Sequence, residues 1–195
     1  MSLAYLADLA QILAEAFLEP DADLKEDLEQ LVKGAPSPAL SEPLGRMTAH
    51  AFAPQDQSVE YARLFLHAKD THVLHLFESA QARGRLMAPE VLGPLQAIYD
   101  EADISLQEDL ATPPDHLGLE FACLSHLLGD VIEGDPDERD RDLDLARRLI
   151  QAHLRPFVGA VAAQLPQTQP HPYYQAVLDL ASALLPETEK ALAEI

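Results

Sequence analysis

The apolar residues of this chain recur at helical spacing from one end to the other, and this pattern constrains the fold most strongly. The clearest example is a segment in which one helix face carries only apolar residues, at i, i+4, i+7, i+11 and i+14: Leu117, Phe121, Leu124, Leu128 and Val131. No segment of useful length alternates between apolar and polar residues, as a half-buried strand would. The sequence therefore predicts an all-α fold, a single globular bundle of about ten helices.

The 195 residues suffice for one domain. We expect residues 1–195 to form a single all-helical domain. Within it we expect an N-terminal part (1–102), a linker (103–114) that ends in two prolines, and a C-terminal part (115–195).

Prolines and polar segments indicate where helices begin and end. Residues 69–86 are expected to form an irregular connection, and Pro156 and Pro186 are each expected to open a short helix. Asp115 directly precedes the long apolar helix, and aspartate accepts hydrogen bonds from the first backbone N–H groups of a helix. We therefore expect Asp115 to be the N-cap of that helix.

The charge of the chain restricts its partners. The chain has 13 lysines and arginines and 33 aspartates and glutamates, so its formal net charge is −20. Such a chain is repelled by phosphate backbones and by anionic lipids, which argues against nucleic acid as a partner. A basic peptide or protein is the partner that this charge favours, and the alternative is that the acidity only maintains solubility.

Cysteine content and hydropathy bear on location. Cys123 is the only cysteine, so neither an intrachain disulfide nor a cysteine-based zinc site is possible. The first residues lack the basic start of a secretory signal, and no apolar run approaches the roughly 20 residues of a membrane helix. We expect the protein to remain in the cytoplasm.

Two groups of residues suggest chemistry, and each has a simpler reading. His67, His72, His75 and Glu78 lie close in sequence and could coordinate a metal, or they form a polar surface loop. Cys123 and His126 could act as nucleophile and base, but cysteine on a strongly apolar helix is usually a small buried hydrophobe. Glycines are few and scattered, so no phosphate-binding loop is present. We expect no enzymatic activity and no cofactor.

Two other segments suggest a peptide-binding surface. His116 and Glu120 are four residues apart, so they share a helix face beside Asp115; the alternative is a plain N-cap with a solvated pair. Aromatic residues occur next to acidic ones in two places, and this combination suits a ligand that is part basic and part apolar. These neighbours are Tyr61 and Phe65 beside Glu60, and Phe77 beside Glu78.

Three stretches, in order, resemble the TorD/DmsD-like redox-enzyme maturation chaperones, which are related to the nitrate reductase assembly chaperones. Glu60 to Phe65 (EYARLF) followed by Phe77-Glu78-Ser79 is similar to the family's E-x-Y-x-x-L-F and Y-E-S elements. Residues 114–120 (PDHLGLE) are similar to its E-P-x-D-H run. His153 to Phe157 (HLRPF) followed by Pro172-Tyr173-Tyr174 resembles its H-L-x-P-W and P-F-Y pair. Phe77, Phe157 and Pro113 depart from the family's tyrosine, tryptophan and glutamate.

This resemblance implies an all-α chaperone of the cytoplasm. Members of the family bind the twin-arginine signal peptide and the catalytic subunit of a molybdopterin-dependent oxidoreductase, and they delay export until the cofactor is inserted. Carried over to this sequence, the resemblance implies a peptide-binding set of seven residues: Tyr61, Phe65, Phe77, Glu78, Asp115, His116 and Glu120.

Two other functions remain open at this point. The first is a general assembly protein for a redox complex that does not read a leader. The second is a metal- or nucleotide-dependent enzyme. The sequence also leaves open whether the protein is a monomer or a domain-swapped homodimer.

Overall fold

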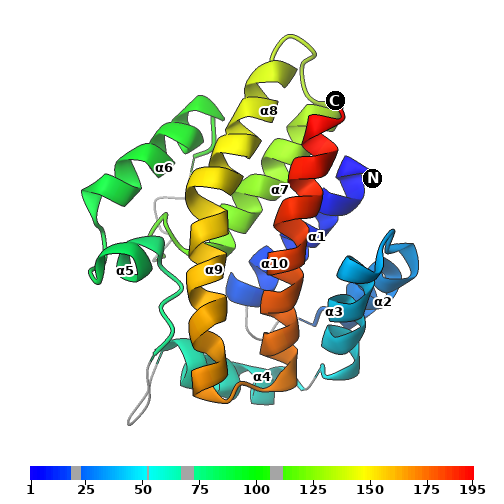
Figure 1. The fold of residues 1–195 in the computed structure, drawn as a ribbon, viewed down its shortest axis with the longest axis vertical. Helices are drawn as coiled ribbons and strands as arrows, with labels where there is room; N and C mark the ends of the chain where they lie inside the picture. Colours follow the sequence, from blue (N-terminus) through cyan, green and yellow to red (C-terminus); the bar gives the residue numbers. More distant parts are fainter. Residues whose placement is uncertain (19–22, 52, 67–72, 106–111) are drawn as a thin grey trace.

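The computed structural model describes residues 1–18, 23–51, 53–66, 73–105 and 112–195 (Figure 1). Within these ranges the chain forms nine helices, counting a helix that continues through a π- or 3₁₀-turn once, and no strand. The predicted all-α fold is confirmed. The α-helices are α1 (Leu3–Leu18), α2 (Lys25–Gly34), α3 (Pro38–Ala49), α4 (Pro54–Tyr61), α5 (Glu78–Arg83), α6 (Pro89–Glu101), α7 (Leu117–Glu133), α8 (Arg139–Arg148), α9 (Arg155–Gln164) and α10 (Pro172–Ala193). The π-helical turns are η1 (Ala62–Leu66) and η2 (Leu149–Leu154), and the 3₁₀ turn is η3 (Leu165–Thr168).

The centre of the bundle is the pair α1 and α7, which run antiparallel along each other. The rings of Phe17 and Phe121 stack across the pair with centroids 6.2 Å apart. Gly118 permits the close approach, because a Cβ atom there would lie 2.6 Å from the side chain of Leu18 and 3.0 Å from the Ala14 carbonyl. The N-terminal and C-terminal parts of the chain therefore share one hydrophobic core.

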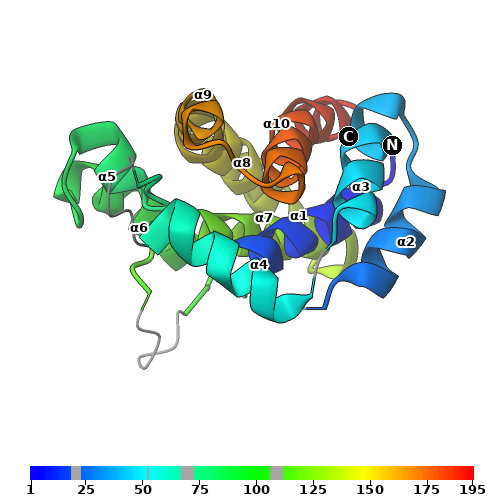
Figure 2. The same ribbon diagram turned by 90° about the horizontal axis from the view of Figure 1, so that it is seen from below.

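The remaining helices surround this pair. Figure 2 shows α8, α9 and α10 as a layer over one side of α1 and α7. Helices α2 and α3 lie at one edge of the molecule, and α5 and α6 lie at the opposite edge. None of the described helices is both long and apolar enough to cross a membrane.

Two prolines do not divide the helices as expected. Pro156 lies at the start of α9, but α8, η2 and α9 form one continuous helix. Pro186 lies inside α10, which runs on to Ala193. A proline removes one backbone donor from the helix. Both helices bury apolar residues on each side of the proline, so tertiary packing outweighs this local loss.

The predicted irregular connection over 69–86 is partly wrong. Within its described part, Glu78–Arg83 forms α5, which ends at Gly84 in the left-handed region (φ 65°). The first N–H groups of α5 are bonded by Asp115, more than 30 residues away in sequence. A contact this distant explains why the local sequence did not indicate the helix.

Candidate functional site

The seven residues of the predicted peptide-binding set fall into two separate groups. Tyr61 and Phe65 lie at the junction of α4 and η1 and pack against α10. The other five lie where α5 meets the start of α7: Phe77, Glu78, Asp115, His116 and Glu120. Six of the seven side chains are buried and Phe77 is half-buried.

The first group is part of an aromatic cluster in the core. The ring of Phe65 lies 5.0 Å from that of Tyr61 and 5.5 Å from that of Tyr174, centroid to centroid. The hydroxyl of Tyr61 donates to the Phe17 carbonyl oxygen at 2.8 Å. Burial raises the pKa of Tyr61 to about 12, so this hydroxyl stays neutral. These rings stabilise the contact of α4 with α1 and α10.

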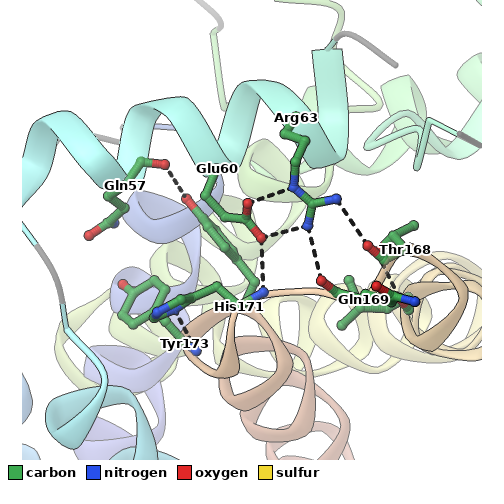
Figure 3. A network of polar contacts seen from close by, with 9 residues as sticks. Gln57, Glu60, Arg63, Thr168, Gln169, His171 and Tyr173 are labelled. Atoms are coloured by element: carbon green, nitrogen blue, oxygen red, sulfur yellow. Dashed lines mark hydrogen bonds and ion pairs between the residues drawn. The ribbon is translucent and has the colours of Figure 1, made fainter. Parts of the chain in front are cut away.

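Beside this cluster, Glu60 and Arg63 form a clamp that joins η1 to the turn before α10 (Figure 3). The Arg63 guanidinium donates to both Glu60 carboxylate oxygens, each at 2.7 Å. It also donates to the carbonyl oxygens of Thr168 and Gln169, at 3.0 and 3.1 Å. Glu60 accepts a further hydrogen bond from the His171 N–H at 2.9 Å. Burial raises the pKa of Glu60, but the bonds from Arg63 and His171 outweigh it, and the pKa lies below its usual value.

The second group belongs to what we call the buried polar junction, in which polar side chains from α5, α7 and η2 meet away from solvent. Its members are Glu78, Ser79, Asp115, His116, Glu120 and His153, all of them buried.

Asp115 holds the start of α5 in the junction. Its backbone carbonyl accepts from the Glu78 N–H and its carboxylate accepts from the Ser79 N–H, both at 2.9 Å. The expectation that Asp115 is the N-cap of α7 is wrong, because its side chain points to another helix. His116 takes the N-cap position, and its Nδ1 atom accepts from the Gly118 N–H at 3.2 Å.

His116 is neutral in this environment. Burial lowers its pKa to about 4, and the charge of Asp115 raises it less. A neutral imidazole leaves Nδ1 free to accept the capping hydrogen bond. The imidazole also contacts the ring of Phe77 edge to face, with centroids 5.2 Å apart.

Glu78 and His153 form a buried pair, with 2.8 Å between Oε2 and Nδ1. His153 comes from η2, the π-helical turn, and π-turns frequently occur at functional sites. This contact between Glu78 and His153, which are 75 positions apart in the chain, joins α5 to η2.

Glu120 differs from the rest of the buried polar junction in its hydrogen bonding. It is fully buried, and neither carboxylate oxygen has a hydrogen-bond partner among the described residues. Burial, and then the charges of Glu78 and Asp115, raises its pKa well above the usual value. Glu120 is therefore held as a neutral acid. One oxygen of Asp115 and the hydroxyl of Ser79 are likewise buried without a partner in the described chain.

Two groups of residues suggested chemistry in the sequence: the possible metal ligands His67, His72, His75 and Glu78, and the Cys123–His126 pair. His67 and His72 lie outside the described residues, and Glu78 is engaged by His153. No group of three or more metal-ligating side chains is suitably placed within the described ranges. Cys123 is buried, and burial, followed by the charge of Glu120, raises the pKa of its thiol. His126 is exposed and pairs with Asp130 at 3.2 Å, so the arrangement does not favour a thiolate nucleophile.

Sequence reasoning did not assign three residues that organise these sites: Arg63, Ser79 and His153. Each lies inside a stretch that carries the family resemblance, which was the available signal. Their partners lie between 36 and 106 positions away, except for the Glu60–Arg63 pair. Spacing alone therefore could not identify them.

A family model described as nitrate reductase delta subunit matches residues 15–163, which is most of the chain and includes all seven residues of the predicted peptide-binding set. No match to a curated protein was found.

Proposed function

The chain belongs to the nitrate reductase delta subunit family, whose members are molybdoenzyme maturation chaperones, and from this premise we propose a specific role. The protein is a cytoplasmic chaperone that performs no chemistry itself. It binds the twin-arginine signal peptide and the apo-form of the catalytic subunit of a molybdopterin-dependent oxidoreductase, and it assists maturation before export.

The family match over residues 15–163 carries this proposal. The net charge of −20 supports it, because a twin-arginine leader has a basic start. The buried polar junction adds a chemical argument against catalysis. Its acids and imidazoles are buried, and those with partners are used in pairing and capping.

The seven-residue peptide-binding set stays a prediction. Because six of its members are buried, a peptide would reach them only after local rearrangement. Glu78, Asp115, His116 and Glu120 would require α5 to move away from α7. Tyr61 and Phe65 would require the segment of α4 and η1 to move away from α10. Phe77 is the member that a ligand could contact without such a movement.

The alternative function is assembly of a redox complex without leader recognition. The acidic surface would suit a basic region of a mature subunit equally well. The two functions differ in whether the leader is needed for binding.

A binding experiment separates them. The full chain is immobilised and presented with the catalytic subunit of a molybdopterin oxidoreductase from the same organism, in leader-bearing and leaderless forms. We expect the leader-bearing form to be retained much more strongly. Equal retention would support the general assembly function instead, and retention of neither form would contradict both.

A further inference from the structure

A groove lies between α1 and α2, at the edge of the molecule far from α5 (Figure 2). Its volume of about 480 Å³ is within the range of roughly 300–1,000 Å³ that is typical of ligand sites. Its apolar lining residues include Tyr5, Ile12 and Leu31, of which Ile12 is buried and the other two are half-buried. The Tyr5 hydroxyl donates to the Leu31 carbonyl oxygen at 2.7 Å, which fixes the two helices relative to each other.

The groove is acidic. Three carboxylates line it, from Asp8, Glu15 and Asp27, and no lysine or arginine does. None of the three forms an ion pair within the ranges that the structure describes, and Glu15 accepts a single hydrogen bond, from Gln11. Arginines elsewhere do have acidic partners, as in Arg46–Asp179, Arg85–Glu90 and Arg148–Glu101.

We propose that this groove receives the arginine-bearing start of the leader peptide, an inference that rests on the proposed function. The three carboxylates attract and orient the two arginines, and the half-buried Leu31 and Tyr5 side chains contact the apolar residues that follow them. An arginine fork can bind a carboxylate through two hydrogen bonds, and its flat face can stack on an aromatic ring.

The burial of the seven-residue set strengthens this assignment. A leader needs an accessible surface that is both acidic and apolar, and six of those seven side chains are not accessible. In the α1–α2 groove, Asp8 and Asp27 are exposed and Tyr5 and Leu31 are half-buried, so acidic and apolar groups are accessible together without any helix having to move.

The test measures binding of two labelled synthetic peptides to the full chain. One carries adjacent arginines followed by an apolar stretch, and in the other both arginines are glutamine. The groove variant is Asp8→Asn/Glu15→Gln/Asp27→Asn. The matched control is Glu133→Gln/Asp137→Asn/Asp140→Asn, which changes the net charge equally at exposed positions outside the groove. Asp27 and Asp140 both lie in the first turn of a helix, so the loss of helix-dipole stabilisation is matched too.

We expect the groove variant to bind the arginine peptide roughly tenfold more weakly, since about two exposed ion pairs are lost. Its affinity for the glutamine peptide should change less than about twofold, because the arginines and the acids are coupled. The association rate should also depend less on salt in the groove variant than in the control.

Two outcomes would overturn the assignment, and they are distinguishable. If groove and control variants lose affinity equally, overall charge explains the binding; if neither loses affinity, the leader binds elsewhere. In both cases the proposed function stands if the wild type prefers the arginine peptide to the glutamine peptide. If the wild type binds neither peptide, the proposed function itself fails, and the groove assignment fails with it. Thermal unfolding of each variant checks that the fold is retained.

Discussion

The clamp at η1 and the buried polar junction use the same functional groups in opposite surroundings. In the clamp, the carboxylate of Glu60 is partly accessible and accepts hydrogen bonds from Arg63 and His171. In the junction, Glu120 is fully buried and has no partner within the described chain. The pKa of Glu60 is lowered and that of Glu120 is raised.

Glu60 and Glu120 both lie in motifs that resemble the family's, but this contrast shows that the motif alone does not tell what each glutamate does. Glu60 stabilises a turn as an ion, whereas Glu120 tolerates burial only as a neutral acid. A buried ionisable group without a partner reduces stability, so its presence in the junction calls for a reason other than folding. Changing one partner at a time in each region tests this view.

The largest effect should follow from removing His153. His153→Ala leaves the Glu78 carboxyl buried without its partner, and breaking a buried pair costs about 3–5 kcal/mol of unfolding free energy. Urea unfolding measures the change. The double variant Glu78→Ala/His153→Ala should lose less than the sum of the two single variants. His75→Ala, at an exposed position, is the control and should change stability by less than about 0.5 kcal/mol. Additive losses would contradict a paired junction.

The next effect has the opposite sign. Glu120→Met removes two unpartnered oxygens and keeps a side chain of similar length, so we expect a gain of about 1–3 kcal/mol at acid pH, where Glu120 is neutral in both the folded and the unfolded chain. Glu133→Met, at an exposed position of the same helix, should have little effect. A loss of stability in Glu120→Met would show that the carboxyl makes a favourable interaction in the folded protein.

The same variant should change the pH dependence. The folded pKa of Glu120 is raised, so its contribution favours folding at acid pH and is lost as the pH rises above the ordinary glutamate pKa of 4.5. The stability advantage of Glu120→Met should therefore grow by about 1.4 kcal/mol per pH unit above that value, until Glu120 ionises.

His116 should act in the opposite direction. Its folded pKa is lowered from 6.5 to about 4, so the stability it contributes is lost as the pH falls through this interval. His116→Asn keeps an N-cap acceptor and should remove that loss. Unfolding of both variants between pH 4 and 7 checks the two signs, and parallel curves for variant and wild type would contradict burial as the cause.

The clamp should respond more weakly. Arg63→Ala removes an ion pair that is partly exposed together with two bonds to backbone carbonyls, and we expect a loss of about 1 kcal/mol. Arg63→Lys keeps the charge but not the planar fork, and should recover only part of the loss. Arg46→Ala breaks a more exposed pair with Asp179 and should cost a few tenths of a kcal/mol. If Arg63→Ala costs no more than Arg46→Ala, the carbonyl contacts contribute nothing.

Periodicity predicted the fold because long helices such as α1 and α7 bury a continuous apolar face. It did not predict α5, whose start is capped from another part of the chain by Asp115. The site residues were recognised as a group through the family-like motifs, but their burial was not foreseen. Sequence spacing reports neighbours on one helix, whereas the Glu78–His153 and Asp115–Ser79 contacts join separate helices.

The smallest effect on stability concerns Asp115 and separates its two candidate roles. Asp115→Asn keeps an oxygen that can accept from the Ser79 N–H, and it removes a charge that raises the pKa of Glu120. We expect a change of only a few tenths of a kcal/mol, whereas Asp115→Leu loses the helix-capping bond and about 1 kcal/mol. If Asp115 also contacts the client, Asp115→Asn should bind the leader peptide more weakly despite this near-wild-type stability. Unchanged leader binding in Asp115→Asn, measured beside the α1–α2 groove variant, would assign Asp115 to the fold alone and leave the groove as the site of recognition.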